Sequence, residues 1–421
     1  MYKQKMIKKC IICITLLFSV MAFSQQNTYS PYSYYGIGEV KFRGTQDARA
    51  MGGLGITGDS ISLNLLNPAS YSHLKLTSLT IGGTTTFATL KNEVDTEKAK
   101  NTSLDYLAVG IPMGKLGAAF GIMPFTAVGY KISNVNNNAF GDEVTKTYSG
   151  QGNLNRFFVG ASYEVNKNLS FGVDFQYNFG NIDNETIEKI TTVILQSRER
   201  NSSRITGTSF NFGALYNRKI LDKYQLYASL VYAPETKLTS ENERNLATVT
   251  FTSNGSEIVN DEQDVAINNT NLVIPSKLAV GLGIGERNKW MLGTEISFQK
   301  NSKMSNRFED ITNATFEDSQ KYVIGGYYIP KFDSFSSYLS RVVYRAGFRY
   351  ENTGLVIKDK SIEDYGMNFG LGLPLGFSKI DLGFEVGVRG TQYNNLIREN
   401  YFNLSVGLSL SDKWFKKRKI D

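Results

Sequence analysis

Apolar and polar residues alternate one by one over stretches of ten to twelve residues, and this pattern constrains the fold of the 421-residue chain more than any other feature. In residues 169–180 every odd position is apolar and every even position is polar or small. Residues 380–389 repeat the pattern, with Phe384 on one face and Glu385 on the other. Successive side chains of a strand point to opposite faces, so both stretches predict strands with one apolar face.

The length of these strands separates a membrane barrel from a soluble sandwich. Strands of globular proteins usually have about five or six residues, whereas a tilted strand needs about 9–11 to cross a membrane. In a barrel the apolar face meets lipid, the polar face lines the lumen, and closure satisfies every backbone group. Beyond the first 24 residues no apolar run has the length of a membrane-spanning helix. We therefore predict an all-β fold, a transmembrane antiparallel β-barrel.

The whole chain gives about fourteen predicted strands, and the connections between them alternate in length. Short connections alternate with long polar ones, and a single-chain barrel has short periplasmic turns and long outer loops. This places both chain ends in the periplasm, with the barrel over residues 75–411. The strands are predicted near 76–90, 103–112, 115–131, 154–165, 168–181, 206–216, 224–238, 273–285, 289–300, 319–329, 340–351, 366–377, 379–392 and 400–411. The long loops are predicted at 91–102, 132–153, 182–205, 239–272, 301–318 and 352–365.

The first residues have the build of a signal peptide for export. Four lysines lead into an apolar run, residues 10–23, that is shorter than the roughly 20 residues of a spanning helix. We expect cleavage after Ser24, so the signal peptide covers residues 1–24 and localisation is the outer membrane. Both cysteines leave with it, which excludes disulfides, thiol nucleophiles and cysteine metal sites.

Charge argues against a nucleic-acid partner. The formal charge of +7 falls to about +3 once the four signal lysines are removed. Part of the remaining excess lies in residues 412–421, which we interpret as a basic, solvated periplasmic tail.

Residues 25–74 do not fit the strand pattern, because they are rich in Gly, Ser, Asn and Tyr and their apolar stretches are too brief to span. Such a segment would sit in or under the lumen, or form a disordered leader. Within it, the stretch 47–56 reads Asp-Ala-Arg-Ala-Met-Gly-Gly-Leu-Gly-Ile, and Asn67-Pro68-Ala69 follows. This pair of motifs resembles the N-terminal signature of FadL-type outer-membrane transporters for long-chain fatty acids and aromatic hydrocarbons.

The resemblance implies a fourteen-stranded barrel plugged by a hatch over residues 25–74. It also implies hydrophobic small-molecule ligands, membrane lipid as the surroundings, and no cofactor. Leu66 stands where the family commonly has an aromatic residue, and relatives of the family act in protein secretion or assembly, so an outer-membrane protein partner is the alternative function. The chain end resembles outer-membrane proteins of the Bacteroidetes type. The predicted hatch and ligand residues are Asp47, Arg49, Gly52, Gly53, Gly55, Asn67, Pro68 and Ala69.

Physical chemistry gives some of these residues a role of their own. The glycines permit positive φ or close backbone approach, which a compact plug needs. Asn67-Pro68 forms a turn and stops a helix. Arg49 could pair with a lumenal carboxylate, for which Asp174 and Glu385 are the candidates, or could be solvated.

A proline inside the third predicted strand indicates a break in the barrel wall. Pro124 cannot donate to the ladder, so it belongs at an edge or a bulge, and a closed barrel has no edge. Gly121 and Gly129 flank it and could absorb a bend. In the FadL-type family the third strand carries a kink that opens the wall sideways, and the resemblance places that kink near Pro124. An ordinary bulge without a passage is the alternative.

Enzymatic function lacks candidate residues. Residues 53–58 match Gly-x-Gly-x-x-Gly, but no buried strand precedes them and no helix follows, so nucleotide binding is excluded. Only one histidine, His73, could act as a general base, and it falls at the predicted periplasmic rim. The acidic residues between 241 and 264 lack the spacing of a calcium loop. We predict no catalytic residues, no metal and no enzyme.

Overall fold

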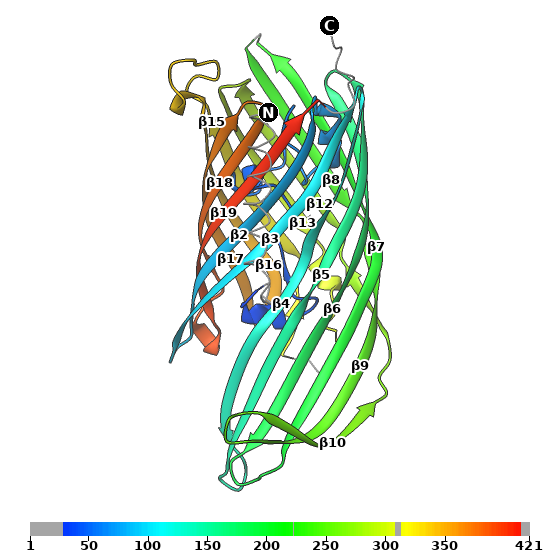
Figure 1. Cartoon of the computed structure of the whole chain (residues 1–421), viewed down its shortest axis with the longest axis vertical. Coiled ribbons are helices and arrows are strands. Elements are labelled where there is room, and N and C mark those ends of the chain that lie inside the picture. The colour runs from blue at the N-terminus through cyan, green and yellow to red at the C-terminus, as the bar shows by residue number, and fades with distance from the viewer. Residues whose placement is uncertain (1–27, 222, 308–312, 414–421) are drawn as a thin grey trace, which may run out of the picture.

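A single antiparallel sheet closes on itself to form the barrel shown in Figure 1. The computed structural model describes residues 28–221, 223–307 and 313–413. The last strand, β19 (Arg398–Asp412), pairs with the first barrel strand, β2 (Thr77–Lys91), and this pairing closes the wall. The predicted all-β barrel is confirmed. The predicted signal peptide and nearly all of the basic tail lie outside the described residues.

The barrel wall has 14 strands, as predicted. The labels run to β19 because β1 belongs to the N-terminal segment and three wall strands are interrupted: β8 continues into β9, β10 and β11 continue into β12, and β14 continues into β15. The other strands are β3 (Thr96–Met113), β4 (Leu116–Asn137), β5 (Glu143–Asn166), β6 (Leu169–Ile190), β7 (Gln196–Ile220), β8 (Tyr224–Ala233), β9 (Thr236–Phe251), β10 (Glu257–Val265), β11 (Thr270–Ile274), β12 (Lys277–Glu286), β13 (Trp290–Gln299), β14 (Ala314–Phe316), β15 (Ser319–Tyr328), β16 (Val343–Ile357), β17 (Lys360–Leu375) and β18 (Ser378–Arg389). Short 3-10 helices occur in the connections at η3 (Asn301–Lys303), η4 (Leu339–Arg341) and η5 (Tyr393–Asn395).

The alternation in the sequence corresponds to the two faces of the wall. In β6, Phe171 and Phe175 are 50% and 43% exposed on the outside, whereas Asp174 and Asn178 are 2% and 0% exposed on the inside. A wall that exposes its aromatic side chains and buries its polar ones is suited to lipid outside and a polar lumen. No helix in the described parts of the chain is long and apolar enough to cross a membrane.

The wall is much taller on one side, and here several predicted loops were wrong. Strands β4 to β7, β9 and β10 extend far beyond the others at the lower end of Figure 1. The stretches predicted as loops at 132–153 and 182–205 are mostly paired strand: Asn137 pairs with Glu143, and β6 pairs with β7 up to Glu188 and Ser197. Much of 239–272 is likewise strand in β9 to β11. These stretches are rich in Thr, Ser and Asn, which suit strands that continue into water beyond the membrane, because a ladder needs no apolar face there.

The two ends of the barrel differ. The turn end carries the short connections between β3 and β4, β5 and β6, β7 and β8, β12 and β13, and β17 and β18. The hairpin end carries the tall strands and their tips. Strand β2 begins at Thr77 and β19 ends at Asp412, and these two paired residues lie at the turn end.

The N-terminal segment, residues 28–74, packs against the inner face of this wall. It contains η1 (Pro31–Tyr34), β1 (Glu39–Val40), α2 (Gln46–Arg49) and η2 (Pro68–His73). Helix α2 contacts β17 to β19, whereas η2 contacts β3 to β7, so the segment spans the interior from one side to the other. Glycines in the wall make the close approach possible. A Cβ on Gly172 would collide with the backbone of Pro68 and Ala69.

We expect the hairpin end to face the cell exterior. An epitope tag inserted at Asn254, in the turn between β9 and β10, should be labelled by antibody on intact cells. A tag at Asn288, in the β12–β13 turn at the opposite end, should be labelled only after permeabilisation. Both tagged proteins must first migrate as folded barrels in unheated gels. Labelling of Asn288 on intact cells would reverse the orientation.

Candidate functional site: a charged lumenal cavity

Helix α2 places the first motif against the inner face of β17 to β19. Its Asp47 accepts hydrogen bonds from Thr45 and, at 2.7 Å, from the Lys379 ammonium of β18. Burial alone would raise the pKa of the Asp47 carboxyl, but Lys379 and Arg345 outweigh burial and hold the pKa below its usual range. Asp47 therefore links the N-terminal segment to the wall as a charged group.

Arg49 forms ion pairs with wall carboxylates, with one partner that was predicted and one that was not. Its guanidinium lies 3.9 Å from the Glu385 carboxylate and 3.3 Å from that of Asp105. It also lies over the ring of Phe42, 4.7 Å from the centroid. Asp174, the other candidate partner, instead accepts a hydrogen bond from the Tyr71 hydroxyl at 3.0 Å.

The glycines of the motif end α2 and let the chain turn. Gly52 and Gly53 have φ of +75° and +94°, in the left-handed region that favours glycine. Their amides donate to Arg49 and Ala48 carbonyls at 2.9 Å. Gly55 donates its backbone amide to the Glu295 carboxylate at 3.2 Å. The three glycines thus shape the backbone of the segment and contribute one contact to the wall.

The Asn67-Pro68-Ala69 motif anchors the segment at the turn end. The Asn67 side chain accepts a hydrogen bond from the Ala69 amide at 3.0 Å and donates to the Ala214 carbonyl of β7 at 3.2 Å. Pro68 occupies the first turn of η2, where its missing amide proton costs nothing. The two halves of the signature therefore hold the segment at two separate places.

Buried charges on β16 to β19 form a paired network beside α2. Its members alternate in sign, and two of its carboxylates, Glu39 and Asp47, come from the N-terminal segment. Pairing is what makes such burial tolerable, because removing one partner leaves an uncompensated charge. The shortest contacts join Arg389 to Glu39 at 2.6 Å, Lys379 to Asp47 at 2.7 Å, Arg345 to Asp381 at 2.8 Å, Arg389 to Asp364 at 3.0 Å and Arg349 to Glu385 at 3.0 Å.

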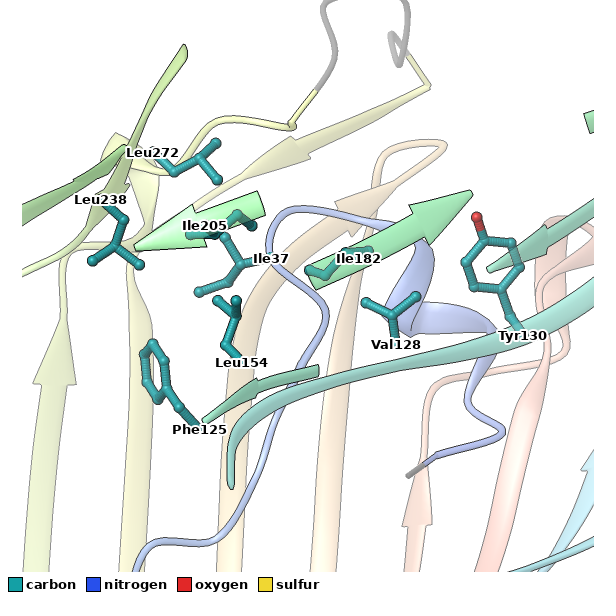
Figure 2. Close-up of a cluster of buried hydrophobic side chains, with 9 residues drawn as sticks. All are labelled: Ile37, Phe125, Val128, Tyr130, Leu154, Ile182, Ile205, Leu238 and Leu272. Atoms are coloured by element: carbon teal, nitrogen blue, oxygen red, sulfur yellow. The ribbon is translucent and has the colours of Figure 1, made fainter. Parts of the chain in front are cut away.

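An apolar cluster covers the opposite inner wall, nearer the hairpin end (Figure 2). It contains Ile37 of the N-terminal segment and one or more side chains from each of β4, β5, β6, β7, β9 and β11. Tyr34 packs against it edge-on to Tyr130, with 5.2 Å between the ring centroids. The members are Ile37, Phe125, Val128, Tyr130, Leu154, Ile182, Ile205, Leu238 and Leu272.

A cavity of about 350 Å³ lies between the network and the apolar cluster. Four cations line one part of it: Arg43, Arg156, Lys277 and Lys321. Lys321 lies 4.0 Å from Glu351, whereas the other three form no ion pair within the described residues. The guanidinium of Arg156 lies 3.9 Å from the centroid of the Phe125 ring and donates to Asn178 at 2.8 Å. The carboxylates of Glu295 and Glu351 also line this side, but the four cations outnumber them, so it can accept an anion.

The wall splits beside the cavity, between β3 and β4. Their ladder ends at the pair Leu107 and Ile122. Beyond it, the register of β4 against β5 shifts between Pro124 and Thr126, so Phe125 forms a bulge. The bulge turns Phe125 and then Val128 inward, and β1 of the N-terminal segment pairs with β4 at Thr126 and Ala127 in place of β3.

Gly121 and Gly129 flank the bulge in the structure and meet different neighbours. A Cβ on Gly121 would lie 2.5 Å from the Leu107 carbonyl oxygen of β3. A Cβ on Gly129 would collide with the Thr28 carbonyl of the N-terminal segment. Gly121 therefore permits the last β3–β4 contacts, and Gly129 permits the segment to cross the split.

Four residues of the cavity, Arg43, Arg156, Lys277 and Lys321, were not predicted. In the sequence, Lys277 and Lys321 each lie near the start of a strand and belong to no motif. Only closure of the barrel brings them close to Arg43. His73 lies at the end of η2, where burial lowers the pKa of its imidazole. No group of three or more potential metal ligands occurs in the part of the chain that the structure describes.

Comparison with known proteins places the chain in a family. A family model for BamG matches residues 6–421. The chain belongs to the BamG family. No curated protein matches this BamG-family sequence.

Solved structures similar to this BamG-family protein include two toluene transporters and a FadL homologue. The Pseudomonas putida toluene transporter TodX has a TM-score of 0.56 and 15% identity, over 92% of this chain and 100% of TodX. The Ralstonia pickettii toluene transporter TbuX has a TM-score of 0.56 and 13% identity, over 88% of this chain and 99% of TbuX. A Pseudomonas aeruginosa FadL homologue has a TM-score of 0.54 and 11% identity, over 89% of this chain and 98% of the homologue. At such identities the likeness establishes the fold, and the FadL-like fold implied by the motifs is confirmed.

Proposed function

We propose that this BamG-family protein moves amphipathic molecules, with a hydrophobic body and an acidic headgroup, across the outer membrane. The observation that carries the proposal is the cavity, which joins unpaired cations to an apolar wall. Its volume of about 350 Å³ is within the range of small-ligand sites. The N-terminal segment acts as the plug, since it fills the lumen on both sides of this cavity.

Arg43, Arg156 and Lys277 are the proposed headgroup site. Arg43 belongs to the plug, Arg156 to β5 and Lys277 to β12, so a bound carboxylate would bridge plug and wall. Burial disfavours unpaired cations, and an anionic headgroup would neutralise them. The apolar cluster begins at Phe125, directly beside Arg156, and offers a surface for the hydrophobic body.

The split between β3 and β4 is the proposed exit. Phe125 and Ile37 lie between the cavity and the split, so a molecule in the cavity would pass apolar side chains on its way to the membrane. A lateral exit spares a hydrophobic molecule the polar turn end of the lumen. The transporters named above have the same fold, which supports transport in general.

We expect Lys277→Met to remove the preference for an anionic headgroup. Wild-type protein in detergent should bind dodecanoate more tightly than 1-dodecanol, because only the carboxylate pairs with the cations. Loss of a buried charge pair costs about 2–5 kcal/mol, so dodecanoate affinity should fall about 30-fold or more while dodecanol binding stays unchanged. Isothermal calorimetry measures both.

Lys219→Met is the matched control, because Lys219 is exposed on β7 and does not line the cavity. It should bind both probes as the wild type does. Equal wild-type affinity for the acid and the alcohol would remove the headgroup site from the proposal.

The second candidate is a barrel without a transport role that acts as a partner subunit in outer-membrane protein secretion or assembly. The tall wall of β4 to β7, β9 and β10 favours it, because Glu185 and Arg200, paired at 2.6 Å in its β6–β7 ladder, offer a charged surface to a partner. Unchanged substrate binding and uptake in the cavity and exit variants would favour this candidate over transport.

A further inference from the structure

Four cations gather on the outer face of β19, β2 and β3 near the hairpin end. Arg398 of β19 lies directly opposite Lys91 of β2 in the ladder. On the other side, Thr89 pairs with Lys98 of β3, and Phe87 pairs with Lys100. Because side chains alternate along a strand, Lys91, Phe87, Lys98, Lys100 and Arg398 all point outward. All four cations are exposed.

The arrangement is unfavourable for the protein alone. Like charges directly opposite in a ladder destabilise the pair, and Lys91 faces Arg398. Within the described residues none of the four cations forms an ion pair. The neighbouring Glu399 points into the lumen, where it lies 3.7 Å from Arg389. The Glu93 carboxylate lies near Lys91 and Arg398, but the four cations outnumber it, so the patch has a net positive charge.

Aromatic side chains border the patch on the side toward the barrel middle. Phe87 and Phe402 lie opposite each other, with ring centroids 6.4 Å apart, and both are exposed. The Lys100 ammonium lies over the Phe87 ring at 5.3 Å. This order, apolar rings and then cations, corresponds to the passage from acyl chains to headgroups in a lipid leaflet.

An open hollow of about 710 Å³ lies above Lys91 and Arg398. Tyr365, Tyr393, Gln392 and the acidic Glu93 also line it. The Gln392 side chain donates to the Asn92 carbonyl at 3.0 Å, so the two connections that form the hollow are tied together. Tyrosine rings and amide groups suit a sugar.

We propose that this patch binds a phosphorylated glycolipid of the outer leaflet, of the lipid A type. The phosphate would lie between Lys91 and Arg398, the sugar in the hollow, and the acyl chains along Phe87 and Phe402. The inference rests on the orientation in which the hairpin end faces outward, not on the transported ligand. Failure of the headgroup test at Lys277 would leave it standing.

The test uses the full-length protein in a neutral detergent, with monophosphorylated lipid A as probe and native mass spectrometry as readout. The double variant Lys91→Gln, Arg398→Gln should bind lipid A at least about tenfold more weakly than the wild type, because two charge-assisted contacts are lost. Lys115→Gln, Lys167→Gln removes the same charge from turn-end connections and should bind as the wild type does.

Two further measurements separate a built site from a general attraction or a folding defect. Lipid A should raise the unfolding temperature of the wild type and of the control, and leave that of the double variant unchanged. Dephosphorylated lipid A should bind the wild type and the double variant equally weakly. Equal lipid A binding by wild type and double variant would overturn the proposal, as would phosphatidylglycerol binding as tight as lipid A.

Discussion

Deletion of residues 25–72 is expected to leave a folded barrel that lets small hydrophilic antibiotics through the outer membrane. Fourteen strands enclose a lumen too wide for wall side chains to fill. The N-terminal segment fills it by contacting β3 to β7 through η2 and β17 to β19 through α2. We expect susceptibility to such an antibiotic to rise about tenfold or more, measured as the inhibitory concentration in cells with equal barrel levels.

A point variant tests the same idea without deleting the charged groups of the segment. Gly172→Leu places a side chain where the backbone of Pro68 and Ala69 now lies, so η2 cannot keep its position. Val173→Leu is the control, since it adds bulk to the same strand on the exposed, outer face. Permeability that stays at the wild-type level in both the deletion and the Gly172 variant would mean that the segment is not a plug.

Pro124→Val is expected to close the lateral exit and reduce uptake of a hydrophobic, acidic probe at least about tenfold. Valine restores an amide that can donate to the ladder and favours continuous strand. Without the proline the backbone no longer requires a bulge at Phe125, so β4 can pair with β3 beyond Ile122. Uptake of radiolabelled dodecanoate by cells measures the effect, after unheated gels have shown that the variant is folded.

Adding Gly121→Val to this variant is unsuitable, because a Cβ at Gly121 would press on the Leu107 carbonyl of β3 and disrupt the ladder that the variant should extend. Pro112→Val is the matched control, as Pro112 lies in β3 within the intact part of the same ladder, opposite Gly117. Undiminished uptake in folded Pro124→Val, together with wild-type uptake in the control, would exclude the side exit and favour the assembly candidate.

Alternation carries most of what the sequence predicts about this fold. The apolar face of β6 is visible in residues 169–180, because lipid demands apolar side chains and the lumen demands polar ones. Ile182 and Ile205 still point into the apolar cluster, but the residues between them lack the alternation, although the β6–β7 ladder continues to Glu188 and Ser197. A strand whose two faces both meet water needs no apolar face. Polarity alone could not separate these strands from loops.

The candidate site, too, has a part that the sequence could predict and a part that it could not. The glycine turn after Arg49 and the break at Pro124 could be predicted, because each follows from a local backbone property of a single residue. The grouping of Arg43, Arg156 and Lys277 could not, since it joins residues from the N-terminal segment, β5 and β12 that meet only when the barrel closes. The pairing of Arg49 with Asp105 is of the same kind.

The closure between β19 and β2 leads to an expectation about the order of events during folding. Fifteen residue pairs, from Thr77 with Asp412 to Lys91 with Arg398, seal the cylinder along this line. The N-terminal segment is held on one side by wall strands made early in the chain and on the other by β17 to β19, made last. We therefore expect the segment to take its place before the last strand pairs with the first, so that it is enclosed as the wall is completed.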